Sequence, residues 1–563
     1  MTTTSYDLLS EPWLPVRMLD GTTQQLSLRE VLARAATISG LLGELPTTSV
    51  ALLRLLLAIL HRSVDTTGRP IERWARHWRA DELPMAHIGG YLDRYADRFD
   101  LLDTTQPFLQ VGDLQTAKAT RGELLPLIAD VPNGAQFFTI RAGRGVTRLS
   151  YDQAARWLVH CHAYDPSGIK SGALGDARVK GGKGYPIGTG WAGNIGAVVI
   201  EGRDLRETLL LNLVLQSRNG DPVEHQADSA VWERPPLTAA PQATEPALRL
   251  PAGPAELLTW PSRRVRLTHD GTAVTGVLIS NGDRLSPPDQ FLESMTAWRR
   301  SAAQEKKLKV SVPVYMPLQH DPARTMWRGL GALLPIGPTS PTDAAPQLPP
   351  LVLRWLHRIR DEDEDLLPAD YPLRTRAVGV TYGSNNSVID EVVDDALMVH
   401  AVLLGAAGAS LRTTALNAVT AADEAGTAVA ALAANLRSAA GDSDDRSLSR
   451  ARQEARETFF FSLDAPYRRW LGALSAGTEP DVALVTWHQV ADRVARGQEA
   501  RLIADSGVAG WRGRAVTRRT GKRHIDTALA SQWFRGSLRK ALPLAAPPDP
   551  EAASTSATED VTA

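Results

Sequence analysis

The chain has 563 residues, with 62 lysines and arginines against 63 aspartates and glutamates and a formal net charge of −1. At about 150 residues per domain, this length predicts two to four domains. Because the charge is balanced, no global field attracts a polyanion, so nucleic-acid binding has to rest on local clusters of charge. The single cysteine, Cys161, excludes an internal disulfide framework and a cysteine-rich zinc site.

Neither the start of the chain nor its most apolar stretch has the pattern of a secretory signal or of a membrane span. The opening MTTTSYDLLSEPWLP lacks the basic and apolar regions of a secretory signal. Residues 50–60 are apolar but contain Arg54 and fall short of the ~20 residues that a span requires. We therefore expect a cytoplasmic protein without a membrane partner, and a disordered tail at 546–563.

The first 387 residues mix strand and helix patterns. Residues 15–19 and 23–28 flank Asp20-Gly21, a dipeptide that favours a tight turn between two strands. Ser27 and Glu30 then match a capping box at the start of a helix. Further helix patterns cover 48–64, 85–100 and 151–163, and strand patterns cover 137–142 and 196–202.

From residue 388 the chain consists of long alanine-rich segments with a period near 3.6 residues. Short breaks separate four of them, at 388–408, 412–441, 446–474 and 481–505. Four helices joined by short loops favour an antiparallel bundle. We therefore predict an α+β fold, with a large mixed domain over 1–387 and a C-terminal four-helix bundle over 388–545.

The glycine-rich segment VKGGKGYPIGTGWAGNIG, residues 179–196, admits several interpretations. Residues 188–193 spell G-x-G-x-x-G, but a strand-like sequence follows where a dinucleotide site requires a helix. A phosphate-binding P-loop needs Ser or Thr after Gly-Lys, and Gly184 stands there. What remains is a structural loop, or a loop whose bare backbone and two lysines, Lys180 and Lys183, approach a polyanion.

Three other motifs are better explained by structure than by chemistry. The run His160-Cys161-His162 cannot converge on one metal from a helix, because consecutive side chains point about 100° apart. The acidic run at 360–370 is typical of a solvated loop, and the rings of TFFFS at 458–462 cover three directions of a helix, so at least one should lie in the core. No nucleophile motif of the G-x-S-x-G type is present.

Positive charge is concentrated at 511–540, where nine lysines and arginines accompany one acidic residue, Asp526. Trp511, Trp533 and Phe534 lie among them and offer surfaces for base stacking. A solvated helix face usually mixes charges of both signs, so this segment favours contact with a nucleic-acid backbone. The expected contacts are Arg512, Arg514, Arg518, Arg519, Lys522 and Arg523.

Several landmarks, taken in order, resemble the CasA family, the large subunit of the type I-E CRISPR surveillance complex Cascade. They are YDLLSEPWLPVRMLDGTTQQLSLREVL at 6–32, TQPFLQV at 105–111, GRDLRETLLLNLVL at 202–215, MTAWRRS at 295–301 and TMWRGLGALL at 325–334. The C-terminal bundle completes the likeness, which spans nearly the whole chain.

This resemblance implies a protein that is not an enzyme and needs no cofactor. No metal is expected either, because the cysteine cluster of some members is missing here. It implies recognition of the protospacer-adjacent motif (PAM) in the minor groove of duplex DNA, strand separation and R-loop formation, and docking of a helicase–nuclease. The implied partners are the other Cascade subunits, guide RNA, target double-stranded DNA and its displaced strand.

The resemblance also assigns site residues. The glycine loop falls on Lys180, Gly181, Gly182, Lys183 and Gly184. The PAM-contacting loop falls on Asn133, Phe137, Phe138 and Thr139, and the minor-groove basic residue on Arg299 or Arg300. The wedge hairpin falls on Gly383, Ser384, Asn385 and Asn386, where the family's glutamine tip is replaced by the two asparagines. Two alternatives stay open: a nucleotide-dependent enzyme using the Gly-Lys loop, and a structural helical scaffold.

Overall fold

The computed structural model describes residues 4–117, 122–130, 146–223, 226–242, 250–334, 345–518 and 521–545. The chain forms two compact units. Unit 1 comprises Met1–Pro368 and Pro372–Leu397, and unit 2 comprises Ala369–Tyr371 and Met398–Ala563. The chain leaves unit 1 within one strand, β13 (Ile389–His400).

Unit 1 begins with a small antiparallel sheet. Strands β1 (Leu14–Met18), β2 (Thr23–Leu26) and β3 (Ile38–Leu41) lie in the order β2-β1-β3. Gly21 takes a positive φ of 86° in the turn between β1 and β2, and the predicted strand pair is confirmed. The predicted capping box is also confirmed at α1 (Leu28–Ala33), where the Ser27 N–H donates to the Glu30 carboxylate at 2.8 Å.

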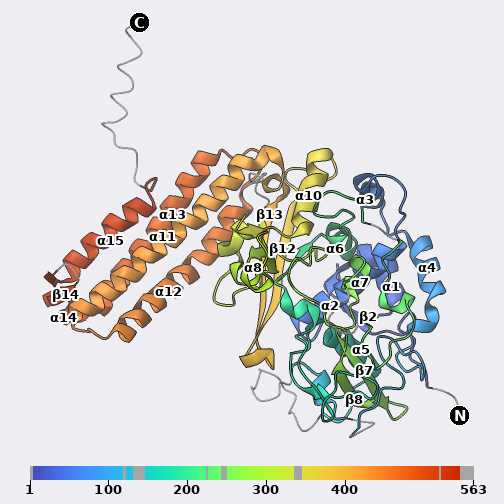
Figure 1. The fold of residues 1–563 in the computed structure, drawn as a ribbon. Helices are drawn as coiled ribbons and strands as arrows, with labels where there is room; N and C mark the ends of the chain where they lie inside the picture. The colour runs from blue at the N-terminus through green and yellow to red at the C-terminus, as the bar shows by residue number, and fades with distance from the viewer. Residues whose placement is uncertain are drawn as a thin grey trace. The chain divides into compact units, whose positions relative to one another are not determined.

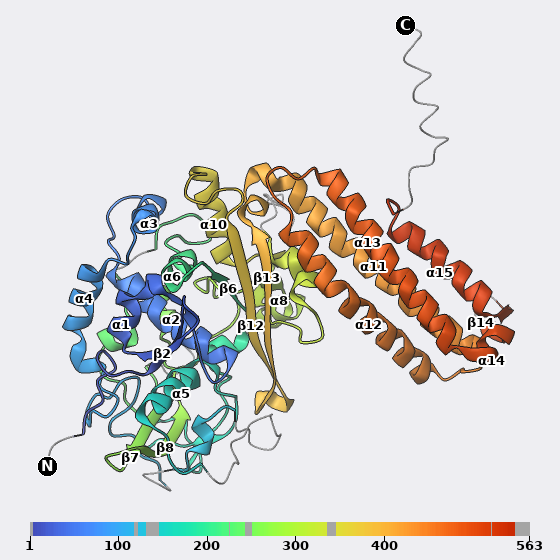
Figure 2. The ribbon, with the colours of Figure 1, turned by 180° about the vertical axis from the view of Figure 1, so that it is seen from behind.

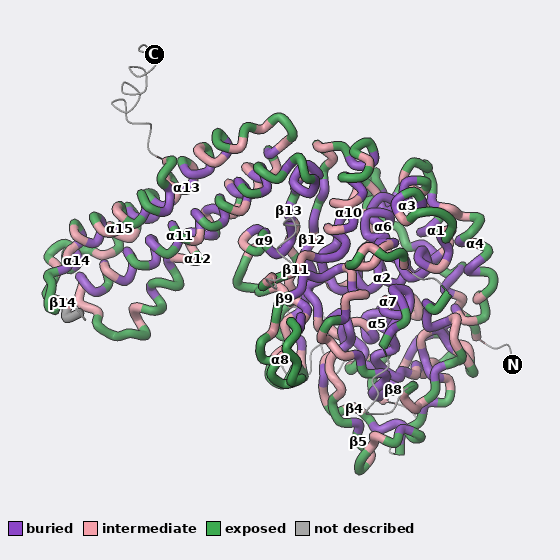
Figure 3. Tube along the Cα trace, turned by 45° about the horizontal axis from the view of Figure 1, so that its top comes forward, coloured by how far each residue is buried: buried purple, intermediate pink, exposed green. Residues whose placement is uncertain are grey.

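Helix α2 (Pro46–Ser63) forms the centre of unit 1, in the buried region drawn in purple in Figure 3. Its side chains are buried on every face, as expected for a helix enclosed by other elements. Arg54 is buried with them and forms a 2.9 Å ion pair with Glu293, which also accepts a hydrogen bond from the Trp191 indole at 2.7 Å. Among the residues that the structure describes, no helix is long and apolar enough to cross a membrane.

Other helices of unit 1 pack around α2 or lie at the surface. They are α3 (Pro70–Arg79), α4 (Met85–Arg94), α5 (Tyr151–Tyr164), α6 (Leu205–Asn212), α7 (Pro254–Leu258), α8 (Ala302–Leu308), α9 (Leu330–Leu333) and α10 (Leu351–Glu362). The strands are β4 (Lys170–Ser171), β5 (Lys183–Gly184), β6 (Ala197–Glu201), β7 (Arg263–His269), β8 (Val274–Asn281), β9 (Trp298–Arg300), β10 (Tyr315–Pro317), β11 (Gln347–Leu348) and β12 (Pro372–Tyr382). The predicted helix at 151–163 and strand at 196–202 are thus confirmed, whereas 137–142 lies outside the described residues.

Strands β12 and β13 form the long hairpin visible in Figure 1, and β12 also pairs with β6. The prediction of a helix at 388–408 is therefore wrong. This segment is rich in Val and Asp, which lower helix propensity, and β12 supplies a pairing partner that local periodicity does not reveal. Pairing with a neighbouring strand decides the structure of this segment.

Unit 2 is mainly helical. It contains α11 (Ala409–Ala440), α12 (Asp445–Gly472), α13 (Pro480–Asp505), the short α14 (Gly507–Arg512) and α15 (Thr527–Ala541), with a hairpin of β14 (Arg514–Arg518) and β15 (Gly521–Ile525). The helices predicted at 412–441, 446–474 and 481–505 are confirmed as α11, α12 and α13. Helix α11 packs against α12, α13 and α15, which run beside it in Figure 2.

Small residues on α11 let large aromatic side chains approach its backbone. The Tyr467 hydroxyl donates to the Ala415 carbonyl at 3.0 Å, and the Trp487 indole donates to the Ala418 carbonyl at 2.9 Å. In the TFFFS motif, Phe459 and Phe460 are buried while Phe461 is 84% exposed, which confirms that part of this motif packs in the core.

Gly426 on α11 is expected to be a packing glycine. A Cβ there would lie 3.0 Å from Cζ of Phe460, whereas a Cβ at Gly497 on α13 would meet nothing within 4 Å. We predict that Gly426→Val lowers the free energy of unfolding by about 1–3 kcal/mol through overpacking. The matched Gly497→Val should change it by less than about 1 kcal/mol. Urea unfolding of the full chain measures both, and equal effects would contradict the packing role.

Candidate nucleic-acid interface

The glycine loop is a tight hairpin. The Lys180 N–H donates to the Lys183 carbonyl and the Lys183 N–H to the Lys180 carbonyl, each at 3.1 Å. Gly181 and Gly182 lie between them with φ of 57° and 70°. Positive φ at both central residues defines a type I′ turn, which favours glycine for steric reasons. The turn is not a phosphate-binding loop ahead of a helix, so the nucleotide-enzyme alternative loses its structural basis.

Only the turn of this loop faces solvent. Lys180, Gly181 and Lys183 are exposed, whereas Gly184 is buried in the pairing of β5 with β4. A Cβ at Gly184 would lie 2.9 Å from Nδ2 of Asn281. Gly184 is therefore fixed by packing, and the part of the loop that a ligand can reach is the pair of lysines with the turn between them, next to the exposed Tyr185.

A cluster of polar contacts attaches this hairpin to β8. Arg178 forms a 2.9 Å ion pair with Asp176 and donates to the Gly282 carbonyl at 3.0 Å. The Asn281 amide donates to the Tyr185 carbonyl at 2.6 Å. Segments on both sides of the turn are thus tied to the end of one strand, so the turn is presented on a fixed base.

Asp165, at the C-terminal end of α5, is the centre of a second cluster. Its carboxylate pairs with Lys170 of β4 at 2.6 Å and with the buried Arg263 of β7. Arg263 also donates to the Gly188 carbonyl at 2.8 Å, and the Asp165 carbonyl accepts from the Gly190 N–H at 2.9 Å. The G-x-G-x-x-G spacing at 188–193 thus serves the packing of this segment against α5.

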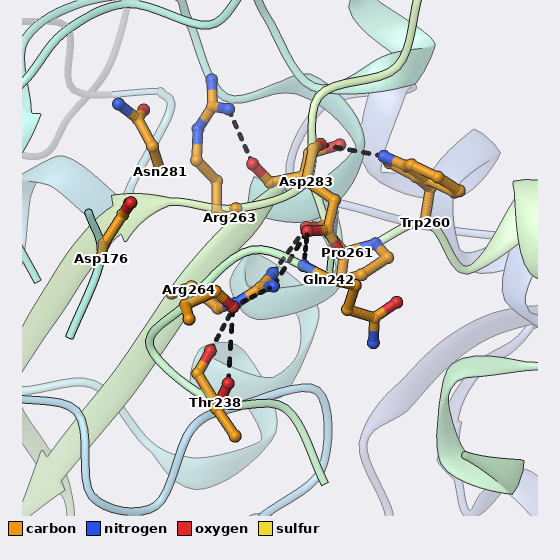
Figure 4. Close-up of polar contacts among 12 residues, drawn as sticks. Asp176, Thr238, Gln242, Trp260, Pro261, Arg263, Arg264, Asn281 and Asp283 are labelled. Carbon is orange, nitrogen blue, oxygen red and sulfur yellow. Dashed lines mark hydrogen bonds and ion pairs between the residues drawn. The ribbon is translucent and has the colours of Figure 1, made fainter. Parts of the chain in front are cut away.

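Next to Arg263, Arg264 is buried in a network of its own, shown in Figure 4. Its guanidinium pairs with Asp283 at 3.1 Å and donates to the Thr238 carbonyl at 2.7 Å. The Gln242 N–H and the Trp260 indole donate to the carboxylate and carbonyl of Asp283, at 2.8 and 2.9 Å. Burial lowers the pKa of Arg264, and these acceptors compensate for the loss of water around its charge. The network fixes the start of β7.

The turn between β12 and β13 lies at 383–388, within the hairpin expected at 381–391. Asn385 and Asn386 are exposed and take positive φ of 57° and 54°. The Asn386 N–H donates to the Gly383 carbonyl at 2.9 Å, and the Gly383 N–H donates to the Val388 carbonyl at 3.0 Å. Asparagine tolerates this left-handed conformation better than most residues, which explains the Asn-Asn pair.

The base of this turn is anchored in unit 1. The Tyr382 hydroxyl, at the end of β12, donates to the Tyr164 carbonyl at 2.8 Å, and removal of water from around it raises its pKa well above the usual value. Val388 at the end of the turn and Ile389 at the start of β13 line a cavity of about 110 Å³, together with Lys170 and residues 125–129. The hairpin turn, the start of β4 and the segment that precedes residue 131 therefore meet at one place.

The remaining predicted residues of unit 1 fall into two groups. Asn133, Phe137, Phe138 and Thr139 lie outside the described residues. Arg299 and Arg300 lie on β9, are exposed, and lead into α8, which has no buried side chain (Figure 3). Arg300 is held by Glu305 at 2.7 Å, whereas Arg299 has no carboxylate partner among the described residues. Of the two arginines, Arg299 is therefore the one whose guanidinium is available to contact DNA.

In unit 2 the basic segment is divided between the end of α14, the β14–β15 hairpin and α15. Of its predicted residues, Arg512, Arg514, Lys522 and Arg523 are exposed, while the side chain of Arg518 and all of Arg519 lie outside the described part. Arg523 stacks over the Trp533 ring at 4.9 Å, and Trp511 is 62% exposed. Phe534 is buried in the core, so the expectation that it offers a stacking surface is wrong.

The motifs assigned to structure have partners elsewhere in unit 1. His160 lies 2.9 Å from the Thr47 hydroxyl, and the His162 ring donates to the Leu109 carbonyl at 2.8 Å. In the acidic run, Glu362 pairs with Arg69 at 2.9 Å. Within the described ranges, no group of three or more His, Cys, Asp or Glu side chains is placed to hold a metal ion.

Sequence reasoning missed the residues that position the site, above all Asp165, Arg263 and Tyr382. A signal existed for the arginine, since Arg263 and Arg264 begin a segment in which Val265 and Leu267 alternate with polar residues, as in a half-buried strand. Charged residues in such a strand are buried only when they are paired. Their partners could not be located, because Asp165 lies 98 residues before Arg263.

The structure thus combines a mixed α/β unit, which carries exposed turns and basic side chains, with a helical unit bearing a basic hairpin. Comparison with known proteins identifies the family. The sequence model of CRISPR-associated protein Cse1 matches residues 7–498, and the chain belongs to this family.

Solved and curated relatives agree with this assignment. The crystal structure of Thermobifida fusca Cse1 is 46% identical, with a TM-score of 0.87, and the match covers 97% of this chain and 100% of that one. CasA/Cse1 of Thermus thermophilus is 30% identical over 334 residues, which are 59% of this chain and 60% of that protein's length. A structure described as a CRISPR RNA-guided surveillance complex shares the fold, with 19% identity, a TM-score of 0.67 and coverage of 95% and 99%.

His162 should make the stability of unit 1 depend on pH. Burial lowers its pKa from 6.5 to about 4, so the unfolded chain takes up the proton first as the pH falls. The stability from the neutral ring is fully present above about pH 6.5 and is lost as the pH falls towards 4. His162→Gln keeps an amide donor for the Leu109 carbonyl without titrating. The wild-type free energy of unfolding should therefore fall more steeply between these pH values than that of the variant, and parallel curves would contradict this.

Proposed function

We propose that this chain is a non-catalytic DNA-binding subunit of a type I-E Cascade complex. In this proposal it recognises the PAM through the minor groove of target duplex DNA and promotes strand separation and R-loop formation. Membership of the Cse1 family supports the assignment. The main structural support for the proposed DNA site is a cavity. The β12–β13 turn, Lys170 and the segment preceding residue 131 meet there.

The glycine hairpin fits a narrow groove. A minor groove about 6 Å wide excludes a helix, and it admits slim side chains and backbone with little side chain. The Lys180–Lys183 turn has glycines at its tip and two exposed lysines beside it. Its lysines would bind phosphates while the tip enters the groove. The exposed Arg299 of β9 would also enter the groove.

The β12–β13 turn fits the role of a wedge. Its two asparagines are exposed, and Tyr382 anchors the strand immediately before it. A turn fixed at its base transmits force to a base pair instead of bending away. The amides would bond the base edges exposed when the first pair opens, and such unstacking costs a few kcal/mol.

Unit 2 is proposed to act as a C-terminal four-helix bundle that guides DNA by its backbone. Arg512, Arg514, Lys522 and Arg523 form an exposed basic group with no carboxylate ion pair among the described residues. Such contacts carry no sequence preference and weaken with salt. Further proposed partners are the other Cascade subunits, guide RNA, the displaced strand, and a helicase–nuclease recruited after R-loop formation. PAM recognition and helicase–nuclease docking need no catalytic group on this chain.

Arg299 and Arg300 provide a matched pair of variants. In the assembled complex, Arg299→Gln should weaken binding to PAM-bearing duplex by about tenfold or more, because an unpaired guanidinium is lost from the groove. Arg300→Gln should have a smaller effect, since Glu305 already holds this side chain at 2.7 Å. Gel-shift titration on duplexes that differ only in the PAM measures both. Equal effects of the two variants, or none, would contradict the role of Arg299.

Replacing both turn asparagines with glycine tests the wedge without straining the turn. Glycine keeps the positive φ of 57° and 54° and removes the two amides. Asn385→Gly/Asn386→Gly should leave PAM-dependent first binding intact and slow R-loop formation on linear duplex by about tenfold or more, since 1.4 kcal/mol of barrier corresponds to tenfold in rate.

A duplex with a pre-opened bubble beside the PAM is the control for the glycine double variant. Because melting is already complete in this substrate, the variant should form an R-loop on it at the wild-type rate. Wild-type opening of linear duplex by the variant would assign the turn a structural role only.

A further inference from the structure

A cavity of about 460 Å³ lies in unit 1, and none of the residues assigned to DNA lines it. Phe291, Leu292, Val214 and Val223 give it apolar walls, and Arg218 is the arginine that lines it. Its size is within the range of about 300–1,000 Å³ found for small-molecule sites. Neither the proposed DNA contacts nor the packing of the core explains this arginine.

Arg218 is partly buried and has few hydrogen-bond partners. Its Nη2 donates to the Pro349 carbonyl at 3.0 Å, but Nε and Nη1 are buried and have no hydrogen-bond partner among the residues that the structure describes. The guanidinium also lies 5.3 Å from the centre of the Phe291 ring, a cation–π contact that offsets part of the loss of water. Two buried N–H groups with no acceptor are costly, so a bound acceptor would stabilise this site.

Two further arginines raise the positive charge around Arg218. Arg358 on α10 donates to the Arg218 carbonyl at 3.1 Å and to the Gln216 side chain at 2.8 Å, and Arg354 lies one turn earlier on the same helix. Burial and the charges of Arg354 and Arg358 lower the pKa of Arg218 to about 9. Three arginines that repel one another thus lie close together, and Arg218 is the one of the three that lines the cavity.

No carboxylate neutralises this cluster among the described residues. Arg218, Arg354 and Arg358 form no ion pair there, although such pairs are common elsewhere in unit 1. Asp289 lines the same cavity, and its Oδ1 accepts the Tyr315 N–H at 2.8 Å. This backbone contact holds one carboxylate oxygen of Asp289, and the arginine charge remains in excess.

We propose that this cavity binds the phosphate group of a nucleotide-sized ligand. Arg218 would donate its unpartnered N–H groups to the phosphate oxygens, because a guanidinium fork matches phosphate geometry. Arg354 and Arg358 would add charge from α10, and Phe291 and the aliphatic walls would contact the attached base or sugar. The phosphate belongs either to a free nucleoside monophosphate or to the end of a short strand.

Thermal unfolding of the full chain tests the proposal with defined probes. These are inorganic phosphate, AMP, adenosine, and an adenine dinucleotide with either a 5′-phosphate or a 5′-hydroxyl. The phosphorylated probes should raise Tm by about 2 °C or more at saturation, and adenosine and the 5′-hydroxyl dinucleotide should not. A larger shift with the phosphorylated dinucleotide than with AMP would identify a strand end, and the reverse a free nucleotide.

Arg218→Met separates ligand binding from folding. Removing an unpaired buried charge should raise Tm in the absence of ligand, and should lower the affinity for AMP about tenfold or more. Arg94→Met, at an exposed position of α4, is the control and should change neither quantity. Arg354→Gln, which keeps the helix and removes one charge, should lower the affinity less and serves if the methionine variant does not fold.

The proposal is overturned if no phosphorylated probe stabilises the wild-type chain, or if the shift is the same in Arg218→Met. It is also overturned if adenosine stabilises as much as AMP. None of these measurements involves duplex DNA, so their failure is distinct from failure of the proposed PAM recognition.

Discussion

The buried ion pair between Asp165 and Arg263 is the contact on which the candidate site depends. Asp165 ends α5, Arg263 begins β7, and Lys170 of β4 joins the same carboxylate. A buried pair adds little net stability, but removal of one partner leaves an uncompensated charge and costs about 3–5 kcal/mol. The fold therefore holds the helix, the strand and the glycine segment in one arrangement.

The exposed residues of the site contribute little to the stability of the fold, because other residues fix the segments that carry them. Lys180, Lys183, Asn385 and Asn386 face solvent, while Arg178, Asp165 and Tyr382 fix the segments that carry them. A turn held by a rigid base loses little conformational entropy when it binds. The same arrangement lets the exposed residues change without loss of the fold.

Features set by neighbouring residues were predictable from the sequence, and features set by distant pairing were not. The Asp20-Gly21 turn and the Ser27–Glu30 capping box depend on short-range geometry, and both are confirmed. Residues 388–408 have the composition of neither a strong helix nor a strong strand, so pairing with β12 decides their structure.

The glycine segment illustrates the same limit within the site. Lys-Gly-Gly-Lys is sufficient to predict a type I′ turn, but the buried position of Gly184 depends on Asn281, almost a hundred residues later in the chain. The preference for Arg299 over Arg300 likewise follows from Glu305, whose side chain reaches back across the start of α8. Such contacts require the structure.

The most direct measurement of the central claim uses Cascade assembled without its large subunit. The purified full chain is added back, and R-loop formation is followed on a set of duplexes that share one target and differ only in the trinucleotide beside it. If this chain recognises the PAM, it should restore R-loop formation on a subset of these trinucleotides. Restoration on all of them alike, or on none, would contradict PAM recognition by this chain.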